Sequence, residues 1–143
     1  MRFIKLGPFY QLRLDRGEDI PLIITDFVKR QKIRSGIITG LGAACDVVLG
    51  YFDLKRRKYR KRRFPDEYEI ASLTGNITWQ GRKPFCHLHV VIANSRLTTH
   101  GGHFFSGRVS AACEVAILPG QKSIGRVEET ATGLKLLDIP VKS

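Results

Sequence analysis

The sequence predicts an α+β fold in which a mainly antiparallel β-sheet carries one long amphipathic helix on one face. Only one segment has the helical spacing of apolar residues, whereas four segments after Ile37 have the composition of strands. Most connections between these segments are short, which favours antiparallel pairing because parallel strands need long crossovers. One helix cannot cover both faces of such a sheet, so the bare face predicts oligomerisation through the sheet.

The helix is predicted over residues 18–32, where apolar side chains recur at i, i+3, i+4, i+7 and i+8. Glu18 and Asp19 suit the positive end of its dipole, and Lys29, Arg30 and Lys32 suit the negative end. The loose alternation before it, over residues 3–14, predicts a single edge or half-buried strand. The later strands are expected at residues 37–54, 64–79, 85–93 and 107–118, with a short last strand at 134–137.

Length and composition predict a single domain over residues 1–143, because 143 residues of which 43% are apolar can bury a real core. No run of eighteen apolar residues and no signal peptide is present, so we expect a soluble, cytoplasmic protein without membrane contact. Cys45, Cys86 and Cys113 are scattered and odd in number, which indicates reduced core residues and not a disulfide framework.

The positive charge is concentrated in one short segment. The net charge is +11, and residues 55–63 hold eight cations, so removing them leaves only +3 for the rest. Unpaired charges at both strand parities cannot all be buried, so this basic arm is expected to project into solvent or against a polyanion. Its candidate nucleic-acid-binding residues are Lys55, Arg56, Arg57, Lys58, Tyr59, Arg60, Lys61, Arg62 and Arg63.

The four histidines lie within residues 87–103. If residues 86–92 form a strand, His87 and His89 face the same way and Cys86 faces the other, which excludes Cys86 from a shared site. Gly101 and Gly102 permit a tight turn or a close approach that could bring His103 beside them, and three imidazoles with an open fourth position can form a zinc site. The alternative is hydrogen-bonded histidines at a sheet surface or subunit contact. His100 follows an apparent loop and is left out.

Several blocks together resemble the PPC domain, the plant and prokaryote conserved domain: RLDRGEDI before the helix, ITGLGA after it, YEIASLTGNI, the HLH strand and GGHFFSGRVSAACEVAI. The resemblance implies the same helix-on-sheet fold and assembly as a homotrimer. It also implies that His87, His89 and His103 correspond to the family's histidine motif near subunit contacts. Plant members place an AT-hook before this domain. The present sequence has none and is similar to the stand-alone prokaryotic type.

Two functions follow from these features. The first is a DNA-associated or scaffolding homotrimer that binds nucleic acid non-specifically through the basic arm, by contacts to phosphates. The alternative is a zinc-dependent enzyme or small-molecule binder at the three histidines, where zinc would activate a bound water. Glu69 and Glu114, each in an apolar strand, would then serve as proton shuttles or as ion-pair partners of Arg13 or Arg108. The sequence has no phosphate loop, nucleophile elbow or dinucleotide fingerprint, so it identifies no substrate.

Overall fold

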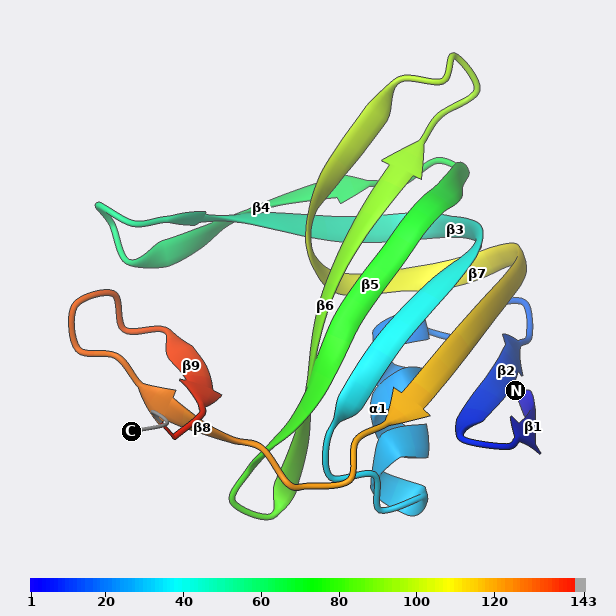
Figure 1. The fold of residues 1–143 in the computed structure, drawn as a ribbon. Helices are drawn as coiled ribbons and strands as arrows, with labels where there is room; N and C mark the ends of the chain where they lie inside the picture. The colour runs from blue at the N-terminus through cyan, green and yellow to red at the C-terminus, as the bar shows by residue number, and fades with distance from the viewer. Residues whose placement is uncertain (141–143) are drawn as a thin grey trace.

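The computed structural model describes residues 1–140 as one helix and nine strands, arranged as a large sheet and a small one (Figure 1). In chain order the elements are β1 (Arg2–Leu6), β2 (Phe9–Leu14), α1 (Ile20–Arg30), β3 (Gly36–Asp53), β4 (Lys58–Phe64), β5 (Tyr68–Gln80), β6 (Lys83–Ala93), β7 (Thr99–Pro119), β8 (Gly125–Glu128) and β9 (Lys135–Asp138). No helix in these residues is both long and apolar enough to cross a membrane.

Strands β1 to β7 form one antiparallel sheet in the order β1-β2-β7-β6-β5-β3-β4. β7 pairs with β3 as well as with β2 and β6, so that β7, β6, β5 and β3 make a closed ring of strands. The antiparallel sheet predicted from the sequence is confirmed. The ring was not predicted, because it depends on pairing between β3 and β7, which are distant in the sequence.

The two longest strands close this ring because they are bent. β3 runs for 18 residues and β7 for 21, and their pairing is irregular between Gly42 and Ala44. Gly42 has a φ of +145°, and a Cβ at this position would lie 2.3 Å from the backbone oxygen of Ala112. Only glycine therefore allows the backbones of β3 and β7 to approach so closely at the bend.

Helix α1 is shorter than the sequence predicted, spanning 11 residues in place of residues 18–32. Asp19 is its N-cap and accepts a hydrogen bond from the backbone N–H of Leu22 at 3.0 Å. Glu18 lies before the helix, where its carboxylate accepts a hydrogen bond from the chain's amino terminus. The helix ends before Lys32, whose φ of 55° is left-handed, while Lys29 and Arg30 occupy the last turn as expected.

The apolar face of α1 packs against β6 and β7 and joins one core with the inner residues of the sheet (Figure 1). Ile20, Ile24, Phe27 and Val28 are all buried there. The ring of Phe27 makes an edge contact with Tyr10 of β2, with ring centroids 5.3 Å apart. Within residues 1–140 no second helix covers the outer face of the sheet.

The ends of the chain differ in part from expectation. The predicted single strand at residues 3–14 is a hairpin, in which a turn at Gly7, with φ of +56°, separates β1 from β2. Leu12 and Leu14 of β2 are buried, as their alternation predicted, whereas β1 is exposed throughout. The predicted strand at residues 134–137 is confirmed as β9, which pairs with β8 in the small separate sheet.

The packing of α1 predicts a large difference between two substitutions on the same helix. Phe27→Ala should lower the free energy of unfolding by about 3–5 kcal/mol, because the ring is 1% exposed and leaves a cavity. Leu22→Ala, at a side chain that is 60% exposed, should change it by less than about 0.5 kcal/mol. Urea denaturation followed by circular dichroism measures both, and equal effects would show that α1 is not anchored by its apolar face.

Candidate metal centre and basic arm

Three of the four histidines come together where β6 pairs with β7. His89 of β6 is the register partner of His103 of β7, and His87 lies two residues earlier on β6 and on the same face. Each offers one ring nitrogen, and these three atoms lie within 4.8 Å of one another. Three ring nitrogens this close together can share one metal ion. The structure thus assembles the three histidines that the sequence singled out.

The electrostatics of the cluster keep at least two of the rings neutral. Burial lowers the pKa of His103 to about 4, with smaller contributions from His87, His89 and Lys61. Burial also lowers the pKa of His87, and the neighbouring His89 and Arg126 add to the effect. His103 and His87 are therefore uncharged at pH 7, which is the form in which imidazole binds a metal.

One atom of the cluster lacks a partner. Nδ1 of His103 is buried and has no hydrogen-bond partner among residues 1–140. Buried polar atoms are nearly always satisfied, so an orphaned ring nitrogen next to two other imidazoles fits a site for a cation. Nitrogen donors of this kind suit zinc among the common divalent metals. The donor set therefore fits zinc.

The glycine pair before His103 serves a close approach and not a turn. β7 continues through Gly101 and Gly102 without a break. A Cβ at Gly102 would lie 2.8 Å from the backbone oxygen of Gly50 in β3, so a side chain at this position would push the two strands apart. Because Gly50 is also the register partner of His103, this contact holds His103 between β3 and β6.

Cys86 and His100 both lie outside the cluster, as predicted. Cys86 packs against the core on the helix side of β6, and burial raises the pKa of its thiol to about 11. His100 follows a loop that ends at Thr98, close to where the sequence indicated one, and it is the second residue of β7. Its ring packs against Phe64, with centroids 4.8 Å apart, and it takes no part in the cluster.

The carboxylates proposed from the sequence are placed away from the histidines. Glu69 is exposed on β5, five residues from Thr74, the partner of His89, which corresponds to about 16 Å along the strand. Glu114 is exposed on β7 and is the register partner of Arg13. Among residues 1–140, however, the ion pair of Arg13 is with Asp15, at 3.4 Å. Arg108 lies beside Asp19 in an isolated bridge.

Comparison with known families shows to which family the chain belongs. The family model of the Plants and Prokaryotes Conserved (PCC) domain, also written PPC, matches residues 1–120. The chain belongs to this family. The resemblance inferred from the sequence is therefore confirmed. A comparison with curated protein sequences found no match.

Solved structures share the fold of this PPC domain over nearly their whole length. A "putative DNA binding protein" of Bacteroides thetaiotaomicron is 28% identical, with a TM-score of 0.93 and 96% of each chain covered. A metal-containing protein of Archaeoglobus fulgidus is 36% identical, with a TM-score of 0.85, covering 95% of this chain and 97% of its own. A PPC protein of Pyrococcus horikoshii is 30% identical, with a TM-score of 0.86 and coverages of 99% and 97%.

The basic arm of this PPC domain is a hairpin made by the end of β3 and by β4, and it projects from the sheet (Figure 1). Asp53 stabilises its turn by accepting hydrogen bonds from the backbone N–H of Arg56 and from the guanidinium of Arg60. At the base of the arm Arg63 donates to Asp46 at 2.5 Å. Two of the eight cations are thus paired with carboxylates, and all eight are exposed.

One face of the arm packs on the histidine cluster. The ring of Tyr59 lies against His103, with centroids 5.0 Å apart, and makes an edge contact with Phe105 at 5.1 Å. Lys61 Nζ lies 3.9 Å from the centre of the Phe105 ring. Gly50 makes room for this packing, since a Cβ there would lie 2.4 Å from the Phe105 ring. The arm and the histidine cluster are therefore one connected structure.

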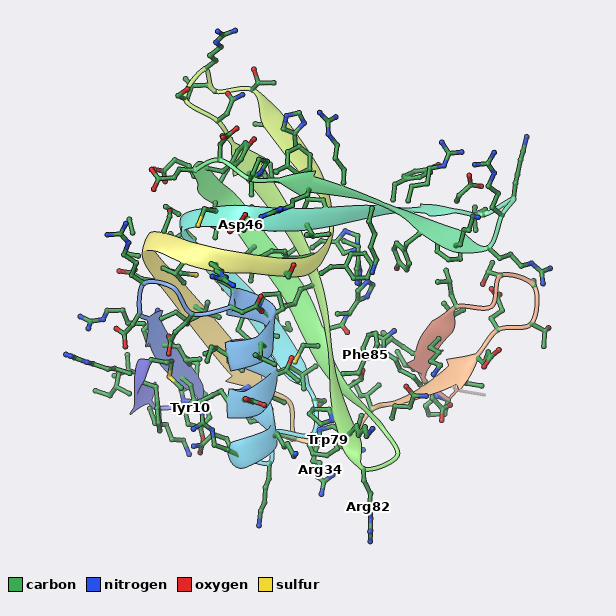
Figure 2. All side chains as sticks on the ribbon, turned by 180° about the vertical axis from the view of Figure 1, so that it is seen from behind. Tyr10, Arg34, Asp46, Trp79, Arg82 and Phe85 are labelled. Carbon is green, nitrogen blue, oxygen red and sulfur yellow. The ribbon has the colours of Figure 1, made fainter. Side chains whose placement is uncertain are left out.

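Sequence reasoning missed three residues that surround the cluster. Phe105 and Phe85 lie two residues from His103 and His87 on the same strands, so alternation could have placed them on the same face. Arg126 of β8 lies 4.3 Å from the Phe85 ring and donates to Thr78 of β5, which attaches the small sheet to the large one. Figure 2 shows Phe85 between β6 and the hairpin of β8 and β9. No local pattern marks Arg126.

Proposed function

We propose that this PPC domain is a cytoplasmic, nucleic-acid-associated homotrimer that binds phosphates through its basic arm. The observation that carries the proposal is the concentration of eight exposed cations on one projecting hairpin, in a chain whose net charge is +11. The β3 and β4 backbones hold the cations on a defined extended surface, and not on a loose tail. The name of the Bacteroides thetaiotaomicron neighbour agrees with this function.

Binding through phosphate contacts determines the sequence preference and the salt dependence of the complex. Arginine and lysine contacts to phosphates release counterions from the nucleic acid but read little of its sequence. The arm therefore binds DNA with low sequence preference and with a steep dependence on salt concentration. In a trimer three arms would act on one nucleic acid, which raises the overall affinity without any new contact.

Neutralising the tip of the arm should weaken DNA binding strongly. We expect the slope of log affinity against log salt to become shallower by up to about four when four exposed residues are changed to glutamine, because each contributes up to one phosphate contact. The residues are Lys55, Arg56, Arg57 and Lys58. Fluorescence anisotropy with a labelled duplex over a salt series measures the slope.

The control variant removes the same charge elsewhere. Four exposed cations far from the arm in the sequence are changed to glutamine, namely Lys29, Arg30, Lys32 and Lys122. This variant should keep most of the wild-type slope. If the two variants lose affinity equally, net charge and not the arm is responsible, and the proposed role of the arm is wrong.

A second function is supported by the histidine cluster. We infer that His87, His89 and His103 bind a zinc ion. Their ring nitrogens lie within 4.8 Å of one another, and His103 Nδ1 is buried without a partner in the described part of the chain. The metal-containing neighbour, at 36% identity, agrees with this inference. When bound by three imidazoles, zinc can act as a Lewis acid or can serve assembly by fixing the two strands. The chain's own residues supply the neutral donors and an apolar rim formed by Phe85 and Phe105.

Metal content distinguishes this cluster from ordinary surface histidines. Protein purified without chelators should contain close to one zinc ion per chain by elemental analysis, and His89→Ala should lower this content at least tenfold because two donors remain. His100→Ala is the matched control, since His100 lies outside the cluster. Absence of stoichiometric metal from the wild type, after incubation with zinc and dialysis, would contradict the inference.

Trimer formation is supported by the apolar outer face of the sheet. Ile37 of β3 and Leu118 of β7 are register partners on this face and are 60% and 46% exposed. A patch of this kind commonly marks a subunit contact. We place it in the trimer interface.

Light scattering should accordingly give a mass of about 48 kDa, three times that of the 16.1 kDa chain. Ile37→Asp should yield folded monomer, because a carboxylate would be buried without a partner in the interface. Leu97→Asp, at a side chain that is 81% exposed outside this face, should leave the trimer intact. A trimeric Ile37→Asp protein would exclude this face as the contact.

A further inference from the structure

Alternation along β4 gives the basic arm two different faces. Tyr59, Lys61 and Arg63 lie on the face that meets the histidine cluster and Asp46. Lys58, Arg60 and Arg62 lie on the opposite face. On that second face the register places Tyr51 of β3 directly beside Arg60. On the second face Asp53 binds Arg60 and the Arg62 guanidinium lies over the Phe64 ring, so both cations are held in position and are still exposed.

The second face borders a hollow of about 440 Å³ between the arm and the beginning of β7. Its lining includes Tyr51, Arg60, Arg62, Phe64 and His100. The His100 and Phe64 rings pack together with centroids 4.8 Å apart, and the Arg62 guanidinium lies 5.1 Å from the centre of the Phe64 ring. The volume falls within the range of small-molecule sites, about 300–1,000 Å³. The hollow is therefore large enough for a flat ring and is walled by aromatic and cationic groups.

Tyr51 is the most informative residue in this hollow. Its side chain is 71% exposed, although its neighbours Leu49 and Asp53 on the same face of β3 are buried. Asp53 holds the adjacent Arg60 through a 2.6 Å hydrogen bond, which fixes a cation next to the exposed ring. An exposed aromatic ring between positioned cations is the arrangement by which proteins stack an unpaired base and contact its phosphates.

We propose that this hollow holds an unpaired nucleobase stacked on Tyr51, so that single-stranded nucleic acid is the preferred ligand of the arm. The proposal rests on the proposed function, in which the arm binds nucleic acid, and names the form of nucleic acid. A duplex offers only its phosphates to the arm, because its bases are stacked on one another. A single strand offers both its phosphates to Arg60 and Arg62 and a free base to Tyr51.

The test compares labelled oligothymidylate of twenty nucleotides with a duplex of twenty base pairs by anisotropy, in the same buffer and salt. Wild-type protein should bind the single strand more tightly. Tyr51→Ala should weaken single-strand binding by about 5- to 150-fold and duplex binding by less than about twofold, since only the single strand loses a stacked base. Tyr51→Phe keeps the ring and should retain single-strand affinity. Leu54→Ala, at another exposed apolar residue beside the arm, should leave both affinities unchanged.

The possible outcomes separate this proposal from the proposed function. If Tyr51→Ala weakens neither ligand while neutralisation of residues 55–58 still weakens both, the arm binds nucleic acid but the base site is wrong. Equal weakening of both ligands by Tyr51→Ala would also overturn the base site. If wild-type protein binds neither ligand at low salt, the proposed function itself fails. If Tyr51→Ala alters the mass of the assembly, the hollow is a contact between copies of the chain and not a base site.

Discussion

The position of His103 between two strands is the constraint on which both candidate sites depend. His103 is paired with His89 of β6 on one side and with Gly50 of β3 on the other. Contact with β6 completes the histidine cluster, and contact with β3 places the base of the basic arm beside it. The contact with β3 requires glycine at two positions, because a Cβ at Gly102 would collide with the backbone of Gly50 and a Cβ at Gly50 would collide with the Phe105 ring. Gly102 and Gly50 therefore allow the arm to lie against the histidine cluster.

Local patterns predicted those features that depend on a single strand. Alternation correctly placed His87 and His89 on one face and Cys86 on the other. It could not predict the ring of strands or the register that sets His103 opposite His89, since these arise from pairing between residues distant in the sequence. The glycine pair permitted either a tight turn or a close approach, and the sequence could not decide between them or identify β3 as the strand approached.

The carboxylates show why an apolar neighbourhood in the sequence is weak evidence for burial. Glu69 and Glu114 occur in apolar strands, which suggested that each needed a partner. Both occupy the outward positions of strands whose inward neighbours fill the core, so solvent stabilises their charges. The basic arm shows the opposite case, in which exposure was predicted correctly but the ion pairs were missed. An excess of charge correctly indicated exposure, yet it concealed that Asp53 and Asp46 bind Arg60 and Arg63 and so hold the hairpin in shape.

The two faces of the arm connect the proposed ligands through one short piece of backbone. Tyr59 rests on His103, while Tyr51, on the neighbouring strand, faces the opposite hollow. A base stacked on Tyr51, as proposed, would restrain β3 and β4, and restraint of β4 would hold Tyr59 against the histidine ring. Linkage requires the effect to be reciprocal: if the metal tightens ligand binding by some factor, the ligand tightens metal binding by the same factor. Gly50 lies between the arm and the histidine cluster, because both Tyr59 and Phe105 pack over it. If metal and nucleic acid both bind as proposed, a side chain at Gly50 would displace Tyr59 and Phe105 and so weaken the coupling between the two ligands.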